Sequence, residues 1–326
     1  MVFTRVLVPA GVLAGALTFP WLASCRGSRA EATKPPTTIR ISAGVPTGTF
    51  GPFSESLVRG YAKLLPDLKF ELVDLPGSVR NLEALENGSV DLGLSQAGIA
   101  YMAYNGRLPD TAHPLRNIRG VAVLNSSIVH LLVAPRSHAR SINDLKLEHL
   151  RVGVGPVGTG NAVMSELLLS PYSADRPATI AVSVGQTADT LLAGKLDAAF
   201  TISGPPHDEV ARAMQQGARL VHVNGPAIDR LRTVYPFLRS AVIPARTYPN
   251  QAEAIHTLSI DVVLLARSEL DDELVRRLTA ALFQMLPQLT SELDFFRDMD
   301  PQRAPATPIP LHRGATLYYR ERELRR

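Results

Sequence analysis

The sequence has one cysteine, Cys25, among 326 residues, so no disulfide can form within the chain and no second thiol is available for catalysis. Stability must therefore come from packing. Charged residues make up 20% of the chain and apolar residues 45%, which excludes a disordered chain and a multi-span membrane protein. The net charge is only +4, and the basic run 320–326 is typical of a solvated helix end, so we expect no nucleic-acid partner.

Motifs of the common catalytic and metal-binding classes are missing as well. The sequence contains no G-x-S-x-G, Walker or H-E-x-x-H motif, and its eight histidines lack the spacing of metal ligands. Residues 153–158 (GVGPVG) match the dinucleotide-binding pattern, but the next predicted strand leads into Gly185 rather than an acidic residue. We interpret His207 as part of the polar first turn of a helix. We therefore expect no enzyme activity, no cofactor and no metal.

A short cassette, L-x-x-G-x-x-D-x-x-x-[S/T], occurs twice, at residues 85–95 and 191–201. In each copy, apolar residues at helical spacing precede a glycine that suits a helix end, and a buried strand with a polar tip follows. Such helix–glycine–strand units are common in α/β proteins, so one copy alone would mean little. Two copies predict two α/β lobes, each with polar strand ends of the kind that bind ligands in open α/β sheets.

The N-terminal segment predicts export and a lipid anchor. Arg5 precedes an apolar stretch that ends in residues 22–25 (LASC), the pattern of a bacterial lipoprotein signal. The alternative is an uncleaved membrane helix, but the prolines and small residues of the stretch fit an export signal better. We expect residues 1–24 to be a signal peptide, Cys25 to carry the lipid, and residues 25–38 to form a flexible tether to the membrane at the cell envelope.

Four glycine-containing loops follow predicted strands and open predicted helices: residues 44–51, 76–78, 155–161 and 185–187. Helix N-termini offer free backbone N–H groups and a partial positive charge, and Ser and Thr hydroxyls add donors. The loops contain no Lys or Arg, which favours a small carboxylate over a phosphate-rich ligand. The alternative is a set of ordinary strand–helix turns in which Ser and Thr only cap the helices.

At these loops the sequence resembles the TAXI-type solute receptors of tripartite ATP-independent periplasmic (TRAP) transporters, over roughly residues 39–322. The segments that carry the resemblance are the first glycine loop, residues 77–82 (GSVRNL), 91–97 (DLGLSQA), 141–146 (SINDLK), 152–161, 197–200 (DAAF), 235–236 (YP), 243–249 (IPARTYP) and 310–319 (PLHRGATLYY). The resemblance implies an α/β protein with the two-lobed, type II fold of periplasmic binding proteins. It further implies a small carboxylate ligand, either an amino acid such as glutamate or glutamine or an organic acid, and a TRAP permease as membrane partner.

The resemblance also supplies ligand-binding residues. It places the following on cleft-facing positions: Thr47, Gly48, Thr49, Gly77, Ser78, Asn81, Gln96, Gly158, Thr159, Gly160, Gln186 and Ser203. Phe50 and Asn161 complete the predicted set, at positions where the chain departs from the Tyr-Tyr and Ser-Gly-Thr of the family.

Two long β-prone runs, residues 127–134 and 256–266, are expected to cross between the lobes. We therefore assign residues 39–134 and 246–326 to lobe one and residues 135–245 to lobe two. We expect a monomer. The alternative function is that of a ligand-sensing or surface lipoprotein of the same fold that is not coupled to transport, and an enzyme on this fold comes third.

Overall fold

A computed structural model describes residues 37–44, 50–109, 111, 113–146, 150–175, 177–183, 185–293, 296 and 299–324. The predicted signal peptide, Cys25 and the loop residues Thr47, Gly48 and Thr49 lie outside these ranges. The first strand begins at Thr37, so the last two residues that we assigned to the tether belong to the fold.

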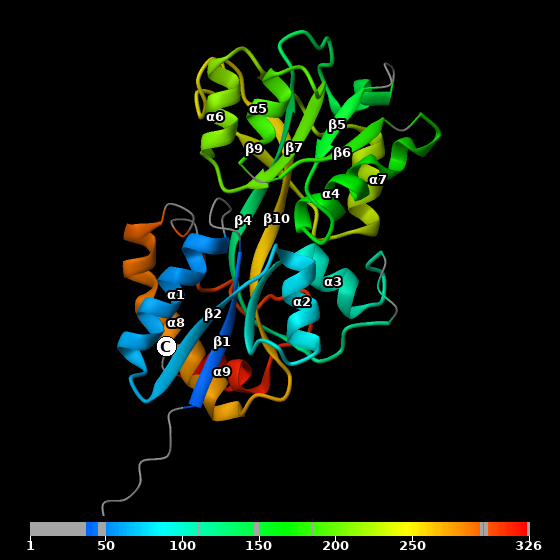
Figure 1. Ribbon diagram of the computed structural model, residues 1–326. Coiled ribbons are helices and arrows are strands. Elements are labelled where there is room, and N and C mark those ends of the chain that lie inside the picture. The colour runs from blue at the N-terminus through cyan, green and yellow to red at the C-terminus, as the bar shows by residue number, and fades with distance from the viewer. Residues whose placement is uncertain are drawn as a thin grey trace, which may run out of the picture. The chain divides into compact units, whose positions relative to one another are not determined.

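The first lobe is built on parallel strands in the order β2-β1-β3, with β10 antiparallel to β3. Its elements are β1 (Thr37–Ala43), α1 (Phe50–Leu64), β2 (Leu68–Asp74), α2 (Ser78–Glu86), β3 (Leu92–Gln96), α3 (Ala97–Tyr104), α8 (Asp272–Glu292) and α9 (Arg313–Leu324). Alternate residues of a strand point to opposite faces of the sheet. In β10, Val262 and Leu264 pack in the apolar cluster with α1, α8 and α9, whereas Val263 and Leu265 pack in the cluster with α2 and α3. Both faces of this sheet are therefore covered by helices (Figure 1).

The second lobe repeats this plan with parallel strands in the order β7-β5-β6. Its elements are η1 (Ile142–Lys146), β5 (Arg151–Val154), α4 (Gly160–Leu169), η2 (Ser170–Asp175), β6 (Ala178–Ala181), α5 (Thr187–Leu192), β7 (Ala198–Ser203), α6 (Asp208–Gln215), β8 (Arg219–Leu220), α7 (Pro226–Val234) and β9 (Arg239–Ile243). The α/β character and the two lobes predicted from the sequence are confirmed.

Two antiparallel strands, β4 (Ile118–Val133) and β10 (Ile255–Arg267), run from one lobe into the other (Figure 1). The first part of β4 pairs with β10, and its last six residues pair with β7 of the second lobe. The predicted run 127–134 is therefore only the second half of a strand of 16 residues. β4 changes its strand-pairing partner near residue 127, and β10 does so near residue 260. Both positions lie inside the segments that we assigned to lobe one, and the lobe boundaries stay a prediction.

The two cassettes form the same structural unit in their two lobes. Asp91 accepts hydrogen bonds from the backbone N (2.9 Å) and the Nε (3.1 Å) of Arg40 in β1. Asp197 accepts the same pair from Arg151 in β5, at 3.0 and 2.9 Å. Each arginine also donates from Nη2 to the carbonyl oxygen of the cassette glycine, at 2.7 and 2.8 Å. The cassette therefore fixes the end of a helix and the start of a buried strand against the neighbouring parallel strand.

Candidate functional site

A cavity of about 120 Å³ is lined by residues of both lobes. The first lobe contributes Gly44, Phe50, Pro76, Gly77, Ser78 and Gln96, and Ser127 comes from the crossing strand β4. The second lobe contributes Gly155, Thr159, Gly160, Asn161, Val182, Gly185, Thr187, Phe200, Thr201, Ile202, Ser203 and His207. The carboxyl ends of β1, β3, β5 and β7 all lie at or just before these lining residues, where open α/β sheets bind ligands. The volume is below the roughly 300–1,000 Å³ of drug-sized pockets, so the cavity suits a small molecule.

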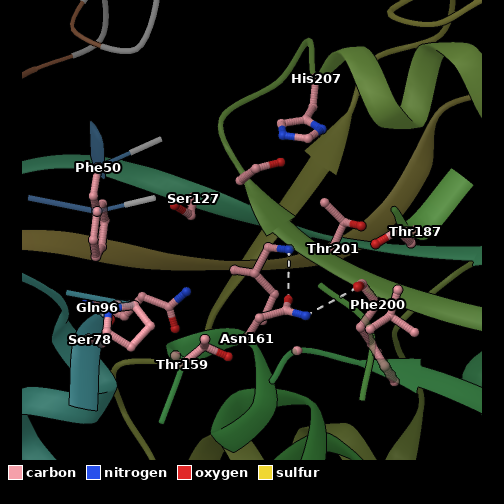
Figure 2. A pocket seen from close by; sticks show the side chains of 18 of the residues that line it. Phe50, Ser78, Gln96, Ser127, Thr159, Asn161, Thr187, Phe200, Thr201 and His207 are labelled. Carbon is pink, nitrogen blue, oxygen red and sulfur yellow. Dashed lines mark hydrogen bonds between the residues drawn. The ribbon is translucent and has the colours of Figure 1, made fainter. Parts of the chain in front are cut away.

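Most of the described residues that we predicted for the site line this cavity. They are Phe50, Gly77, Ser78, Gln96, Thr159, Gly160, Asn161 and Ser203. Figure 2 shows side chains from the two lobes facing one another across it. The lobes also touch at its floor, because a Cβ on Gly160 would lie 2.8 Å from Ser78 Oγ and 2.9 Å from Gln96 Oε1.

Three predicted residues lie elsewhere. Asn81 is the fourth residue of α2 and is fully buried. Its Nδ2 donates to the carbonyl oxygen of Leu94 at 2.8 Å, so its side chain holds β3 and does not line the cavity. Gly158 lines a separate groove, where its backbone turns beside Arg80. Gln186 precedes α5 between two cavity-lining residues but does not line the cavity itself.

Two residues of the wall use their side chains to build it. Thr159 Oγ1 accepts from Ala162 N (3.2 Å) and donates to Pro156 O (2.7 Å), which caps α4. Asn161 Nδ2 donates to Phe200 O (3.3 Å), and Asn161 Oδ1 accepts a backbone hydrogen bond from β7, as the dashed lines in Figure 2 show. These side chains hold the backbone of the cavity wall in place. Because their polar atoms are already hydrogen-bonded, polar groups that are free to bind a ligand must come from other residues.

Buried polar groups without a partner supply those free groups. Gln96 Oε1 in the first lobe and Thr201 Oγ1 and Ser203 Oγ in the second have no hydrogen-bond partner among the described residues. A buried polar group left unpaired costs about 1–3 kcal/mol, so such groups are expected to meet a ligand or water. Ser78 Oγ accepts from Gln96 N at 3.1 Å, which leaves its hydroxyl hydrogen free to donate.

The second lobe also contains a hydrogen-bonded chain behind the cavity wall. His130 of β4 is fully buried, with its Nδ1 3.2 Å from Thr201 O and its Nε2 2.8 Å from Tyr248 Oη. Burial lowers the pKa of His130 to about 4, so the imidazole is neutral at pH 7, donates from Nδ1 and accepts at Nε2. Tyr248 Oη in turn accepts from the backbone N of His207 at 3.1 Å. These hydrogen bonds, from His130 through Tyr248, hold the backbone of His207 in place.

His207, Thr201 and Ser127 line the cavity but were not predicted from the sequence as site residues. Thr201 is visible as the last residue of the second cassette, at the tip of a buried strand. His207 immediately precedes α6, as expected for a helix start, but the sequence gives no sign that its ring also lines the cavity.

Charge at the cavity wall is nearly absent. Within the described part of the chain no Asp, Glu, Lys or Arg lines it, and the adjoining segment 45–49 also contains none. The same part of the chain holds no group of three or more His, Cys, Asp or Glu residues that could bind a metal ion. It also contains no helix that is long and apolar enough to cross a membrane.

Comparison with known proteins places this chain in a family. Residues 41–322 match the model of the NMT1-like family, which is most of the sequence. The chain belongs to the NMT1-like family. The match does not distinguish TAXI-type receptors within the family, so that narrower assignment stays a prediction.

Solved structures share the fold of this NMT1-like protein. MatC from Rhodopseudomonas palustris with bound malate is 16% identical, with a TM-score of 0.56 over 89% of this chain and 98% of that one. The periplasmic binding protein BugD is 11% identical, with a TM-score of 0.56 over 90% and 95%. PhnD1 from Prochlorococcus marinus in complex with methylphosphonate is 13% identical, with a TM-score of 0.55 over 89% and 99%. At these identities the likeness shows the fold, which is the two-lobed fold of periplasmic binding proteins.

Proposed function

We propose that this protein is an extracytoplasmic solute-binding receptor that captures a small carboxylate for a TRAP-type secondary transporter. One observation carries the proposal: unpartnered hydroxyl and carboxamide groups from both lobes meet in a single small cavity. A ligand that donates a hydrogen bond to Gln96 Oε1 in one lobe and accepts one from the Thr201 or Ser203 hydroxyl in the other, as a hydroxy acid such as malate can, would hold the lobes together. The protein acts by binding alone, without chemistry on the ligand.

The expected ligand is an anion because the donors at the cavity suit one. The helices α2 and α4, of 9 and 10 residues, begin at the wall with Ser78 and Gly160, and their first N–H groups carry partial positive charge. Two proteins of the same fold hold small anions, malate in MatC and methylphosphonate in PhnD1, which supports this class.

An organic acid fits the wall better than an amino acid does. An α-ammonium group would meet only neutral oxygens, since no carboxylate side chain lines the described wall. Glutamate and glutamine stay within the proposed class, and we expect their analogues without the amino group to bind more tightly.

The transport role and the membrane anchor rest on the sequence. We propose that Cys25 is lipidated, that the receptor stands at the cell envelope on the tether that follows, and that TRAP permease subunits are its membrane partners. This is the function that the resemblance to TAXI-type receptors implies, within the NMT1-like family.

A ligand screen tests the proposal. Protein lacking residues 1–25 is melted with succinate, malate, glutarate, L-glutamate and L-glutamine, and each acid that raises the melting temperature is titrated by calorimetry. Succinamide and glutaramide, which lack the carboxylates, are the matched controls. The proposal predicts saturable one-to-one binding of at least one acid and none of its diamide. Equal binding of acid and diamide, or no binding of any acid, would contradict it.

A further inference from the structure

His207 is the one side chain with a titratable group at the cavity wall, within the part of the chain that the structure describes. It projects from the start of α6 toward the cavity (Figure 2). Its Nδ1 is buried and has no hydrogen-bond partner there. Its backbone N donates to Tyr248 Oη at 3.1 Å, which holds the backbone from which the ring projects.

The groups around His207 come from three elements. From β4, the imidazole of His130 is neutral at pH 7, and from the loop after β9, burial raises the pKa of the Tyr248 phenol, which is also neutral. On α6 itself, Asp208 and Glu209 favour the charged imidazole, although Glu209 is already paired with Arg212 and accepts from Ala188 N at 3.2 Å. Burial outweighs the two carboxylates and lowers the pKa of His207, so the ring of the empty site is largely neutral at pH 7.

This inference rests on the proposed function. We propose that His207 binds a carboxylate of the ligand as an imidazolium, so that the receptor takes up a proton from solvent together with its acid. A carboxylate brought to within hydrogen-bond distance of a buried imidazole favours the charged form and makes a charge-assisted hydrogen bond. The unpartnered Nδ1 becomes satisfied in the complex, and the cavity gains the cation that its wall otherwise lacks.

The location of His207 indicates which acids could contact it. Ser78 and Gln96 of the first lobe lie across the cavity from His207, which stands with Thr201 on the wall of the second lobe. A dicarboxylate can place one end at the helix N-termini and the other at His207. The proton then binds only when the acid spans the cavity.

Calorimetry over a pH series measures proton uptake directly. Malate, succinate and glutarate are titrated into the protein at pH 6.5, 7.5 and 8.5, each in two buffers of different ionisation enthalpy. The acids remain ionised over this range, and His130 titrates well below it. We expect buffer-dependent heat that reports uptake of a fraction of a proton, and an affinity that falls with rising pH, by at most about tenfold per pH unit for one proton.

Variants assign the proton to one residue. H207Q keeps a polar side chain that cannot be protonated, and we expect it to weaken binding at pH 6.5 by roughly tenfold or more while removing both the proton uptake and the pH dependence. H138Q, at an exposed histidine of the second lobe, is the control and should behave as the parent. Melting curves show whether each variant is folded; should H207Q fail to fold, the uptake measured on the parent decides the proposal.

The outcomes separate this inference from the receptor function. Binding of an acid by the parent with no proton uptake, or with a pH dependence that folded H207Q retains, would overturn the role of His207 and leave the receptor function standing. Failure of every acid to bind the parent at all three pH values would overturn both.

Discussion

Asn161, at the start of α4, accepts a hydrogen bond on its Oδ1 from the backbone amide of Ile202 in β7, across 3.1 Å. The parallel pairing of β5 with β7 ends at Gly153 and Ala199, so the later residues of β7 lack a strand partner on that side. The side chain of Asn161 takes the place of that strand and holds the tip of β7, which carries Thr201 and Ser203, at the cavity.

Replacing Asn161 is expected to lower stability as well as affinity. In N161A the partly buried backbone N–H of Ile202 and carbonyl oxygen of Phe200 lose their partner, which should cost about 1–3 kcal/mol in the free energy of unfolding. Urea unfolding followed by circular dichroism measures the change, and N224A, at an exposed asparagine, is the control. If N161A unfolds with the same free energy as the parent, the prediction is wrong, and water replaces the hydrogen bonds of the side chain at no cost in stability.

Gly160 tests the contact between the lobes. A side chain at this position would meet Ser78 and Gln96 of the opposite lobe, at distances below 3.0 Å from the first added carbon. We expect G160V to fold but to bind the acid roughly ten- to a hundredfold more weakly, because the lobes cannot bring their donors to the ligand together. V157A, in the same loop at a side chain that is 82% exposed, should bind as the parent does. Equal affinity of folded G160V and parent would show that the acid does not bind in this cavity.

The buried His130 predicts a loss of stability in acid. Its pKa is about 4 in the folded protein and near 6.5 in the unfolded chain, so below pH 6.5 the unfolded state binds more protons and stability falls until pH reaches about 4. The expected loss is about 2 kcal/mol between pH 7.5 and 5. Urea unfolding at several pH values should show a shallower dependence in the double variant H130L/Y248F, which removes the titrating group and its partner together.

An exposed histidine provides the comparison for that series. H113Q should keep the full pH dependence of the parent, since His113 lies on the surface. An identical pH dependence in parent and H130L/Y248F would mean that other groups cause the acid sensitivity.

The lipid anchor is a prediction from residues 22–25 and concerns a part of the chain outside the described structure. C25S should abolish incorporation of labelled palmitate and alter processing, because the lipid is attached to that thiol. S28A, three residues further on, should be modified as the parent is. Equal labelling of C25S and parent would contradict the anchor.

Local patterns predicted the fold well where a local cause determines the structure. The cassette glycines, Gly88 and Gly194, end their helices in left-handed conformations, at φ values of 75° and 71°, and the strands that follow are buried as expected. The strand β4 was predicted only in part, because Arg119 and Gly120 interrupt the apolar pattern of its first half. That half is held by pairing with β10, more than a hundred residues away in the sequence.

The details of the site depend on such distant contacts even more. Asn161 looks like a ligand donor from its loop, and only the position of β7, about 40 residues later, reveals that its hydrogen bonds are already used. His207 shows the opposite error. Its position before α6 accounts for a polar residue at a helix start, so the sequence offers no reason to predict that it also lines the cavity. The sequence therefore predicts which strand ends line the cavity, and tertiary packing decides which side chains there are free.

A crystal structure of the protein with the acid that binds most tightly tests the central claim most directly. We expect a carboxylate between the lobes, with an oxygen within hydrogen-bond distance of Ser78 Oγ or Gln96 Nε2 on one side and of the Thr201 or Ser203 hydroxyl on the other. An acid bound outside this cavity, or contacting only one lobe, would contradict it.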